Sequence, residues 1–426
     1  MQGKIASRFR IRENGSTPRR EVLAGLISFV TGVYIVVVNA KIMADAGVPL
    51  AAASAASAVG AGVGSLVMGL WANAPLMLIP GLGDSALFTY TLVHGMGLSW
   101  QEALGVVSAA GALFALVAFT PLAESLTRAI PESLKAAISA GVGLFLAFIG
   151  LKQGGLIVAG SGSLVALGDL RDPTVLLTLV SLVVTVVLYL RQVRGAFLIS
   201  IAAGTLLAAL AGQLGSAAGP AATAAGYGAV VGRLSLTRAA DLVFWVATFS
   251  VTMVVLFENL GMMYGLLPDK EKVHRSLQAN ALSMTLAGAL GCTPTVAAAE
   301  GAAGIAAGGR TGLTAVTAGL LFLAALAALP VIGLIPNSAT APILIVVGSL
   351  MSESLRSIPF QDLTEGIPAF LVIALIPLTF SVADGIAFGL LAYPVVKAAA
   401  GRWRDVRPPM YIAAGLFLLY FVLQVR

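Results

Sequence analysis

The chain has 426 residues, of which 58% are hydrophobic and 10% charged, and its formal net charge is +6. Soluble domains carry about 25% charged residues, so this composition excludes a soluble protein and predicts an all-α polytopic membrane protein. The single cysteine, Cys292, excludes an intramolecular disulfide and a cysteine-rich metal site. The basic residues lie in short loops between apolar runs, which argues against nucleic acid as a partner.

Apolar runs in the first half of the chain predict seven membrane spans. Residues 1–21 are rich in arginine and carry no signal-peptide cleavage pattern, so we expect a cytoplasmic N-terminal segment. The third run is broken by Pro80 and Gly81, which interrupt a helix, and Asp84 follows them. The predicted spans of this first repeat (22–211) cover residues 22–43, 52–71, 79–93, 103–120, 134–151, 174–190 and 196–211.

A small-residue-rich stretch, residues 212–240, predicts a loop between two repeats. The second repeat (241–399) again contains seven predicted spans, and its third is again broken. These spans cover residues 241–264, 276–290, 297–307, 313–329, 338–351, 367–380 and 383–399. Residues 400–426 form a C-terminal segment, and its apolar stretch 410–423 fits either an interfacial helix or an extra span.

Glu300 is the central residue of the second broken segment. A charge near the bilayer midplane costs about 2.5 to 3.5 kcal/mol, so such a residue usually faces a cavity and handles a substrate or proton. Thr293-Pro294-Thr295 cannot continue a helix cleanly, because proline lacks an amide hydrogen and restricts the residue before it. We therefore expect a half-helix whose N-terminal end, near residues 295–297, points into a binding site.

Broken segments in the third place of each half favour a seven-plus-seven inverted repeat with a transport site between its halves. Counting from a cytoplasmic N-terminus places the basic loops on the cytoplasmic side, which supports fourteen spans. The sequence thus predicts a multi-pass protein of the inner or plasma membrane. An ion channel would need a continuous polar pore, and an enzyme would need a nucleophile, metal cluster or general-base pair. We find neither pattern and expect a transporter that is not an enzyme.

Several long stretches carry a family resemblance, namely residues 9–26, 129–145, 309–316 and 381–389. They resemble the AzgA-like guanine, hypoxanthine and adenine permeases of the nucleobase:cation symporter superfamily. The resemblance implies a core of spans 1–4 and 8–11, a gate of spans 5–7 and 12–14, and elevator-type alternating access with proton symport. It also implies a homodimer that needs no cofactor apart from the coupling ion, which is a proton, with sodium as an open alternative.

The resemblance places Glu258 and Glu300 at the carboxylates that bind the substrate ring and exchange the coupling proton. A carboxylate accepts two hydrogen bonds from adjacent N–H groups, and it takes up a proton when desolvated. The remaining substrate-binding candidates lie beside these carboxylates or at corresponding positions of the repeat. They are Asp84, Ser85, Ala86, Ala299, Phe257, Asn39 and Thr295.

Alternatives stay open for several of these residues. Asp84 fits an N-cap as well as a binding role, because aspartate is favoured at helix starts. Phe257 fits ordinary packing, and Asn39 fits a hydrogen bond between helices. If Asp84 faces the same cavity as Glu258 and Glu300, three carboxylates favour a guanidinium or amine cation as substrate. A pyrimidine is a further alternative to a purine.

Overall fold

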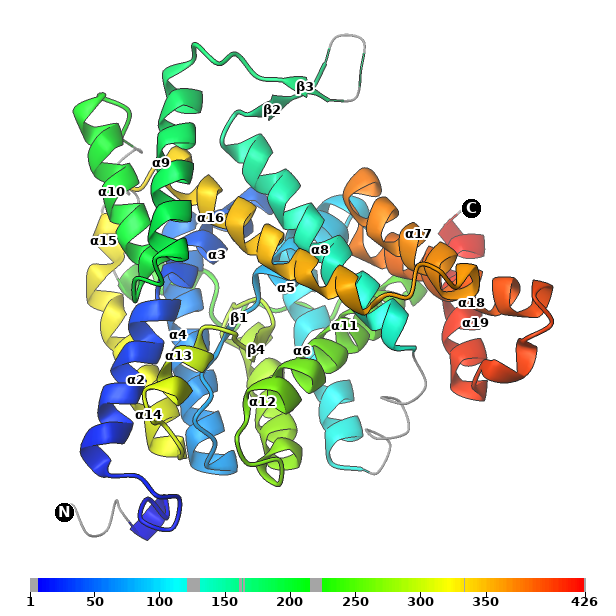
Figure 1. Cartoon of the computed structure of the whole chain (residues 1–426), viewed down its shortest axis with the longest axis horizontal. Helices are drawn as coiled ribbons and strands as arrows, with labels where there is room; N and C mark the ends of the chain where they lie inside the picture. Colours follow the sequence, from blue (N-terminus) through cyan, green and yellow to red (C-terminus); the bar gives the residue numbers. More distant parts are fainter. Residues whose placement is uncertain are drawn as a thin grey trace.

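The computed structural model describes residues 7–120, 131–160, 163, 165–214, 224–332 and 334–424. They are mostly helical (Figure 1), and short 3-10 or π stretches are labelled η. The first half contains α2 (Pro18–Gly32), α3 (Tyr34–Asp45), α4 (Leu50–Val67), η1 (Met68–Ala72), β1 (Leu78–Pro80), α5 (Leu82–Ala86), η2 (Leu87–Gly95), α6 (Trp100–Ala118), α8 (Glu132–Gln153), β2 (Ile157–Val158), β3 (Ala166–Leu167), α9 (Pro173–Leu190), α10 (Ala196–Leu210) and η3 (Ala224–Ala229).

The second half repeats the alternation of long helices with one broken segment. Its elements are α11 (Leu242–Leu266), α12 (Lys272–Ala289), β4 (Thr295–Ala297), α13 (Gly301–Ala306), α14 (Gly312–Ala324), η4 (Ala325–Ala328), α15 (Leu329–Ile332), α16 (Asn337–Met351), η5 (Ser352–Ser357), α17 (Leu363–Thr379), α18 (Val382–Ala399), η6 (Trp403–Asp405) and α19 (Pro408–Gln424). The apolar stretch at 410–423 is thus helical, and α19 packs against α18 and α11.

Length and hydropathy identify the chain as a multi-pass membrane protein. Within the described residues, eight helices are long and apolar enough to cross a membrane, and three further apolar helices are shorter. The eight are Pro18–Asp45, Leu50–Ala72, Trp100–Ala118, Glu132–Gln153, Pro173–Leu190, Leu242–Leu266, Asn337–Ser357 and Val382–Ala399. Fourteen spans remain a prediction, because the broken segments and the shorter helices do not reach this length and α12 is not apolar enough.

Local sequence signals explain where several helices begin. Thr17 caps α2 by accepting a hydrogen bond from the backbone N–H of Arg20, and a proline occupies the first helical position. Ser99 and Glu102 form a reciprocal capping box at the start of α6. Each cap satisfies backbone donors that have no partner inside the helix. These polar residues therefore set the entry points of apolar helices.

The predicted helical class is confirmed, and the two broken segments meet as an antiparallel pair of short strands. β1 pairs with β4 so that Ile79 lies opposite Val296, and all six strand residues are buried. The Gly81 N–H donates to the Pro294 carbonyl at 3.1 Å. Extended backbone is tolerated at membrane depth only where protein satisfies its polar groups. Each broken segment here supplies the partners of the other.

The predicted start of the second half-helix is wrong. The segment at 295–297 is strand β4, and helix α13 begins only at Gly301, one residue after Glu300. Pairing with β1 holds this backbone extended beyond Pro294, so the helix cannot form until the strand ends. Glu300 therefore lies at the junction of strand and half-helix.

The alternative role of Asp84 as an N-cap is also wrong. Gly81 holds the N-cap position of α5, and no side-chain cap hydrogen bond is present there. Asp84 instead lies within the first turn, where it is completely buried. Its conformation is thus that of a helical residue turned toward its neighbours.

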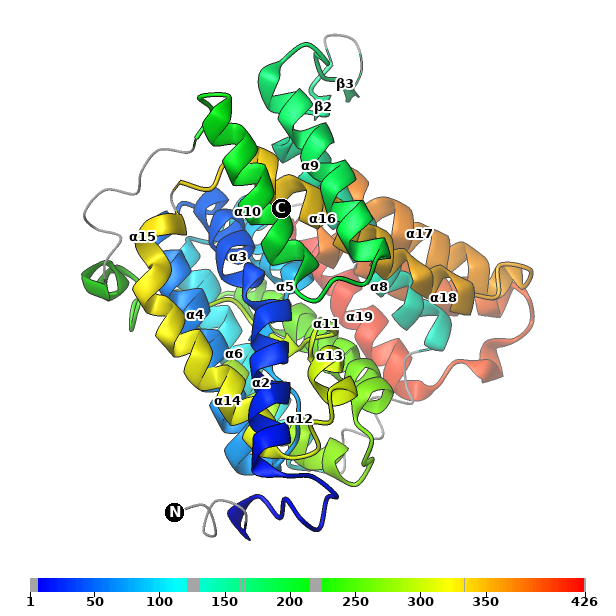
Figure 2. The ribbon, with the colours of Figure 1, turned by 60° about the vertical axis from the view of Figure 1, so that its left-hand side comes forward.

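Most contacts between helices fall within two bundles, which Figure 2 separates toward lower left and upper right. The strand-side bundle consists of α2, α3, α4, α6, α11, α12 and α14, and the flanking bundle of α8, α9, α10, α16, α17 and α18. Glycines let helices approach closely within each bundle. A Cβ at Gly288 would lie 2.3 Å from the Leu104 carbonyl oxygen, and one at Gly348 would lie 2.3 Å from the Gly143 carbonyl oxygen.

Candidate functional site

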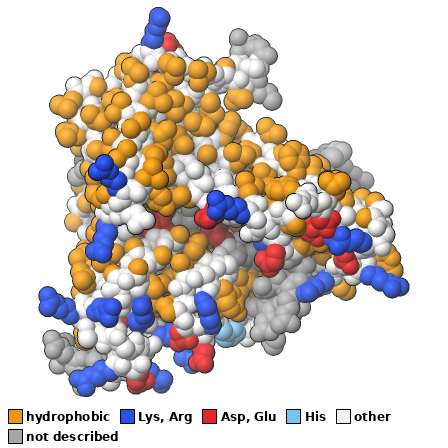
Figure 3. Space-filling model, viewed as in Figure 1, with side chains coloured by type: hydrophobic (Ala, Val, Ile, Leu, Met, Phe, Trp, Pro, Cys, Tyr) orange, Lys and Arg blue, Asp and Glu red, His pale blue; other side chains and the backbone are white. Residues whose placement is uncertain are grey.

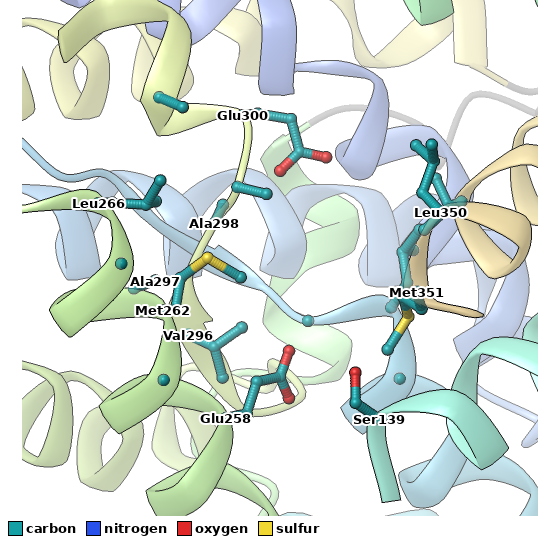
Figure 4. A pocket seen from close by; sticks show the side chains of 18 of the residues that line it. Ser139, Glu258, Met262, Leu266, Val296, Ala297, Ala298, Glu300, Leu350 and Met351 are labelled. Carbon is teal, nitrogen blue, oxygen red and sulfur yellow. The ribbon is translucent and has the colours of Figure 1, made fainter. Parts of the chain in front are cut away.

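A cavity of about 1470 Å³ lies between the two bundles, at the level where β1 and β4 cross. Its walls come from the β1–α5 and β4–α13 segments, from α3 and α11, and from α8 and α16 of the flanking bundle. Figure 4 shows Glu258 and Glu300 entering it from opposite ends of the segment that contains Val296, Ala297 and Ala298. The cavity is therefore bounded by both broken segments.

Glu258 reaches the cavity from α11 and is partly buried. The next residue, Asn259, is completely buried and ties α11 to the strand. Its Oδ1 atom accepts a hydrogen bond from the Ala297 N–H at 2.7 Å, and its Nδ2 donates to the Val255 carbonyl at 2.8 Å. Asn259 thus sets the distance between Glu258 and β4, a role that the sequence analysis did not assign.

Glu300 is held by two side chains from the first span. The Tyr34 hydroxyl donates a short hydrogen bond to Oε1 of Glu300, and the Thr31 hydroxyl donates to its backbone carbonyl at 3.2 Å. Hydrogen bonds to charged groups stabilise by about 1.5 to 3 kcal/mol. Tyr34 therefore holds the Glu300 carboxyl group in position. Neither tyrosine nor threonine stood out in the sequence, because both occur singly within an apolar run.

Asp84 lies just outside the cavity wall, and its carboxyl group faces that of Glu258. It is completely buried, and no hydrogen-bond donor among the described residues reaches either of its carboxylate oxygens. A buried anion without a donor is costly, so this arrangement calls for a proton or a cation.

Asn39 and Ser85 belong to a buried polar layer behind the cavity. The Thr293 hydroxyl donates to Oδ1 of Asn39 at 3.2 Å and lies 3.0 Å from the Ser85 hydroxyl, while Nδ2 of Asn39 donates to the Ser57 hydroxyl at 2.8 Å. This layer joins both broken segments to α3 and α4. It positions the strands and does not line the cavity.

The remaining predicted site residues fall into three places. Ala299 lines the cavity and is exposed to it, next to Glu300. Ala86 and Thr295 are buried away from the cavity, where the Thr295 hydroxyl lies 2.7 Å from that of Ser283. The side chain of Phe257 lies outside the part of the chain that the structure describes. The cavity therefore brings together Glu258, Glu300 and Ala299, with Asp84 directly behind.

Charged side chains of both signs line the cavity. Lys135 and Arg194 are among the lining residues and lie at helix ends, far along the chain from the two strands. Figure 3 shows that Lys and Arg side chains on this face gather mostly in its lower half. Within the described ranges, no group of three or more His, Cys, Asp or Glu could hold a metal ion. Beside β4 the cavity is lined by Glu258 and Glu300 among apolar side chains (Figure 4).

Solved structures of membrane transporters have a fold similar to that of this chain. The transmembrane domain of a cyanobacterial bicarbonate transporter, BicA, matches with a TM-score of 0.65 at 17% identity, over 86% of this chain and 96% of that chain. The murine anion transporter Slc26a9 in its inward-facing state also matches with a TM-score of 0.65, at 14% identity, over 89% of this chain and 68% of that chain. The chain therefore has a membrane transporter fold.

Comparison of sequences identifies the family. The Permease family model, Xan_ur_permease, matches residues 19–388. The nucleobase transporter PlAzg2 of Paenibacillus larvae is 45% identical over 88% of this chain and 76% of its own length. The guanine/hypoxanthine permease PbuO of Bacillus subtilis is 38% identical over 96% of this chain and 99% of its own, and the adenine permease AdeP of Escherichia coli is 37% identical over 99% and 96%. The chain belongs to this permease family and is a transporter, not an enzyme.

Proposed function

We propose that this chain carries a nucleobase across the membrane, a purine such as guanine, hypoxanthine or adenine, together with a proton. Three relatives are 37% to 45% identical to this chain over most of its length. They are a nucleobase transporter, a guanine/hypoxanthine permease and an adenine permease. A purine presents ring and exocyclic N–H donors at its edges, and carboxylates accept such donors in pairs. The acidic and apolar interior of the cavity suits a flat, weakly charged ring of this kind.

The observation that carries this proposal is the placement of two carboxylates in one cavity. Glu258 comes from α11 and Glu300 from the residue before α13, and the intervening strand β4 separates them (Figure 4). Ala298 and Ala299 leave open space between the two carboxyl groups. A planar ring in that space would meet one acceptor at each end, which fixes its orientation.

Uptake of radiolabelled purines into proteoliposomes tests this proposal. We expect saturable uptake by the native chain, and at least a tenfold loss for Glu258→Gln and for Glu300→Gln. A hydrogen bond to a charged group is worth about 1.5 to 3 kcal/mol, and about 1.4 kcal/mol corresponds to a factor of ten. Glu13→Gln, an exposed glutamate of the N-terminal segment, is the matched control and should behave like the native chain. Native uptake by both cavity variants would rule out this role.

The two bundles support an elevator-type cycle, in which one bundle moves along the other. At one end of the molecule the bundles are joined by side chains of α3, whose Lys41 donates to Asn337 on α16 at 2.9 Å and whose Asp45 accepts from Gln153 on α8 at 3.2 Å. At the other end the cavity reaches Lys135 and Arg194. Because basic ends usually face the cytoplasm, we propose an inward-open state that is closed outside.

A small cation is the second candidate substrate, and Asp84 is the observation that favours it. Three carboxyl groups lie in or directly behind the inner cavity, and uncompensated buried anions repel one another. A guanidinium or amine compound would neutralise them. The same uptake assay decides between the candidates: competition by guanidinium compounds but not by purines would replace the nucleobase as substrate.

A further inference from the structure

Asp84 and Glu258 form an isolated pair of carboxyl groups. Asp84 comes from α5 in the first repeat and Glu258 from α11 in the second, and only Glu258 lines the cavity. The Asp84 carboxylate lies over Gly81, where a built Cβ would come within 2.1 Å of Oδ2. Glycine at this position therefore leaves the space that the buried carboxyl group occupies.

Two ionised carboxyl groups would be unfavourable in this arrangement. Carboxylates only accept hydrogen bonds, so two ionised groups facing each other have no donor between them. Neither oxygen of Asp84 finds another donor within the described residues. With a single proton, the protonated carboxyl group donates a hydrogen bond to the carboxylate, and the pair then carries one negative charge. Two adjacent buried carboxyl groups share a proton for this reason.

Other charged groups on the neighbouring elements are engaged elsewhere. Helix α5 packs against α3, η2, α8 and α11, and Glu258 is the charged group that acts on Asp84. The other titratable side chains of these elements are placed as follows: Tyr34 with Glu300, Lys41 with Asn337, Tyr90 and His94 with Asp45, Lys135 with Glu132, Lys152 over the ring of Phe380, and Tyr264 exposed. No described cation therefore takes the place of the proton.

We infer that Asp84 and Glu258 hold one exchangeable proton between them, and that this pair is the proton-coupling site of the transporter. This inference rests on the proposed function. In one cycle the pair binds a proton from one side, the Glu258 oxygens that face the cavity accept N–H groups of the substrate, and both proton and substrate leave on the other side. Glu300 lies at the opposite end of the cavity segment from Glu258 and accepts a hydrogen bond from the Tyr34 hydroxyl, so it is the second acceptor for the substrate.

Infrared spectroscopy of the purified protein tests the pair without any substrate. A protonated carboxyl group has a C=O stretching band separate from those of carboxylates, and we expect such a band to persist at neutral pH in the native chain. It should disappear in Asp84→Asn and in Glu258→Gln, and remain in Glu300→Gln and Glu13→Gln. If one pair variant fails to fold, the other answers the same question. A band that persists in a folded pair variant overturns the inference.

Transport measurements test the coupling itself. In proteoliposomes, Asp84→Asn should keep exchange of internal for external substrate, while accumulation driven by a pH gradient falls at least tenfold. Unchanged gradient-driven accumulation in Asp84→Asn would overturn the coupling role.

The nucleobase proposal and the proton-pair proposal can fail separately. If the infrared band is lost in the pair variants but the native chain transports no purine, the nucleobase is rejected and the proton pair is kept. If the native chain transports purines but Asp84→Asn keeps the native band, the proton pair is rejected and the nucleobase is kept.

Discussion

Tyr34 joins the first span to the candidate binding carboxylate, because its hydroxyl donates a hydrogen bond to Glu300. The two residues are 266 positions apart in the chain. Tyr34 also packs edge-to-face against Phe197 of α10, with ring centroids 4.9 Å apart. This contact links the strand-side bundle to the flanking bundle beside the cavity. Tyr34 therefore combines a hydrogen bond to the site with a packing contact across the interface.

Removal of the Tyr34 hydroxyl should weaken substrate binding without unfolding the protein. Tyr34→Phe keeps the ring and its packing but leaves Glu300 without its donor, so we expect roughly tenfold weaker binding, from about 1.5 to 3 kcal/mol per charged hydrogen bond. Concentration-dependent uptake measures this change. Tyr227→Phe is the control, because it removes a hydroxyl that donates to the Leu290 carbonyl outside the cavity. Equal affinities in the two variants would contradict the role of Tyr34.

At the scale of elements, the crossing of β1 and β4 is what the site is built on. A strand of three residues cannot hold its position through backbone pairing alone. Three contacts therefore fasten this crossing to the surrounding helices: Asn259 binds the Ala297 N–H, Ser65 binds both backbone groups of Leu78, and Thr295 contacts Ser283. Each tie comes from a buried polar side chain on a neighbouring helix.

Asn259→Ala should destabilise the protein and loosen the site together. The variant leaves the buried Ala297 N–H without an acceptor, which costs about 1 to 3 kcal/mol. We expect a lower melting temperature in detergent and weaker purine binding, because β4 then moves relative to Glu258. Asn14→Ala serves as control, because it removes hydrogen bonds with the Arg10 carbonyl and with Nζ of Lys272, and neither residue lines the cavity. A native melting temperature and native affinity in Asn259→Ala would show that the strand is held by other contacts.

At the scale of the whole molecule, side chains of α3 join the two bundles at one end, called the closed end, beside a smaller cavity of about 430 Å³. The larger cavity extends toward Lys135 and Arg194. Asp45 is the centre of the closed end, where it accepts hydrogen bonds from Tyr90 at 2.5 Å and from Gln153 at 3.2 Å. Tyr90 lies in η2, which contacts α3 and α6 of the strand-side bundle, whereas Gln153 lies in α8 of the flanking bundle. An elevator-type movement has to break the Asp45–Gln153 contact in every cycle.

A covalent bond across this closed end should stop transport. We expect Asp45→Cys with Gln153→Cys, in a Cys292→Ala background, to lose uptake on oxidation and to regain it on reduction. Cys292 is the single cysteine of the chain and is completely buried, so its removal avoids competing cross-links. Each single cysteine variant under oxidant is the control. Full uptake by the cross-linked protein would mean that the bundles do not separate here.

Local patterns in the sequence are enough to identify several features of this protein. Low charge and long apolar runs identify a multi-pass membrane protein, because only such a chain can leave so much apolar surface uncovered. Proline and glycine mark both broken segments, and the stretches resembling a permease family are confirmed by the family match over residues 19–388. An acidic residue inside an apolar run also singles out Glu258 and Glu300 as candidates, since its burial requires a reason.

The tertiary structure alone decides how these pieces meet. The strand at 295–297 replaces the predicted helix start because its partner lies more than two hundred residues earlier in the chain. The hydrogen bond from Tyr34 to Glu300 and the facing carboxyls of Asp84 and Glu258 likewise join distant segments. Periodicity and capping signals report only on neighbours within a few turns. Pairings across the fold depend on how helices pack. Here that packing gives Glu300 a side-chain donor and leaves Asp84 without one among the described residues.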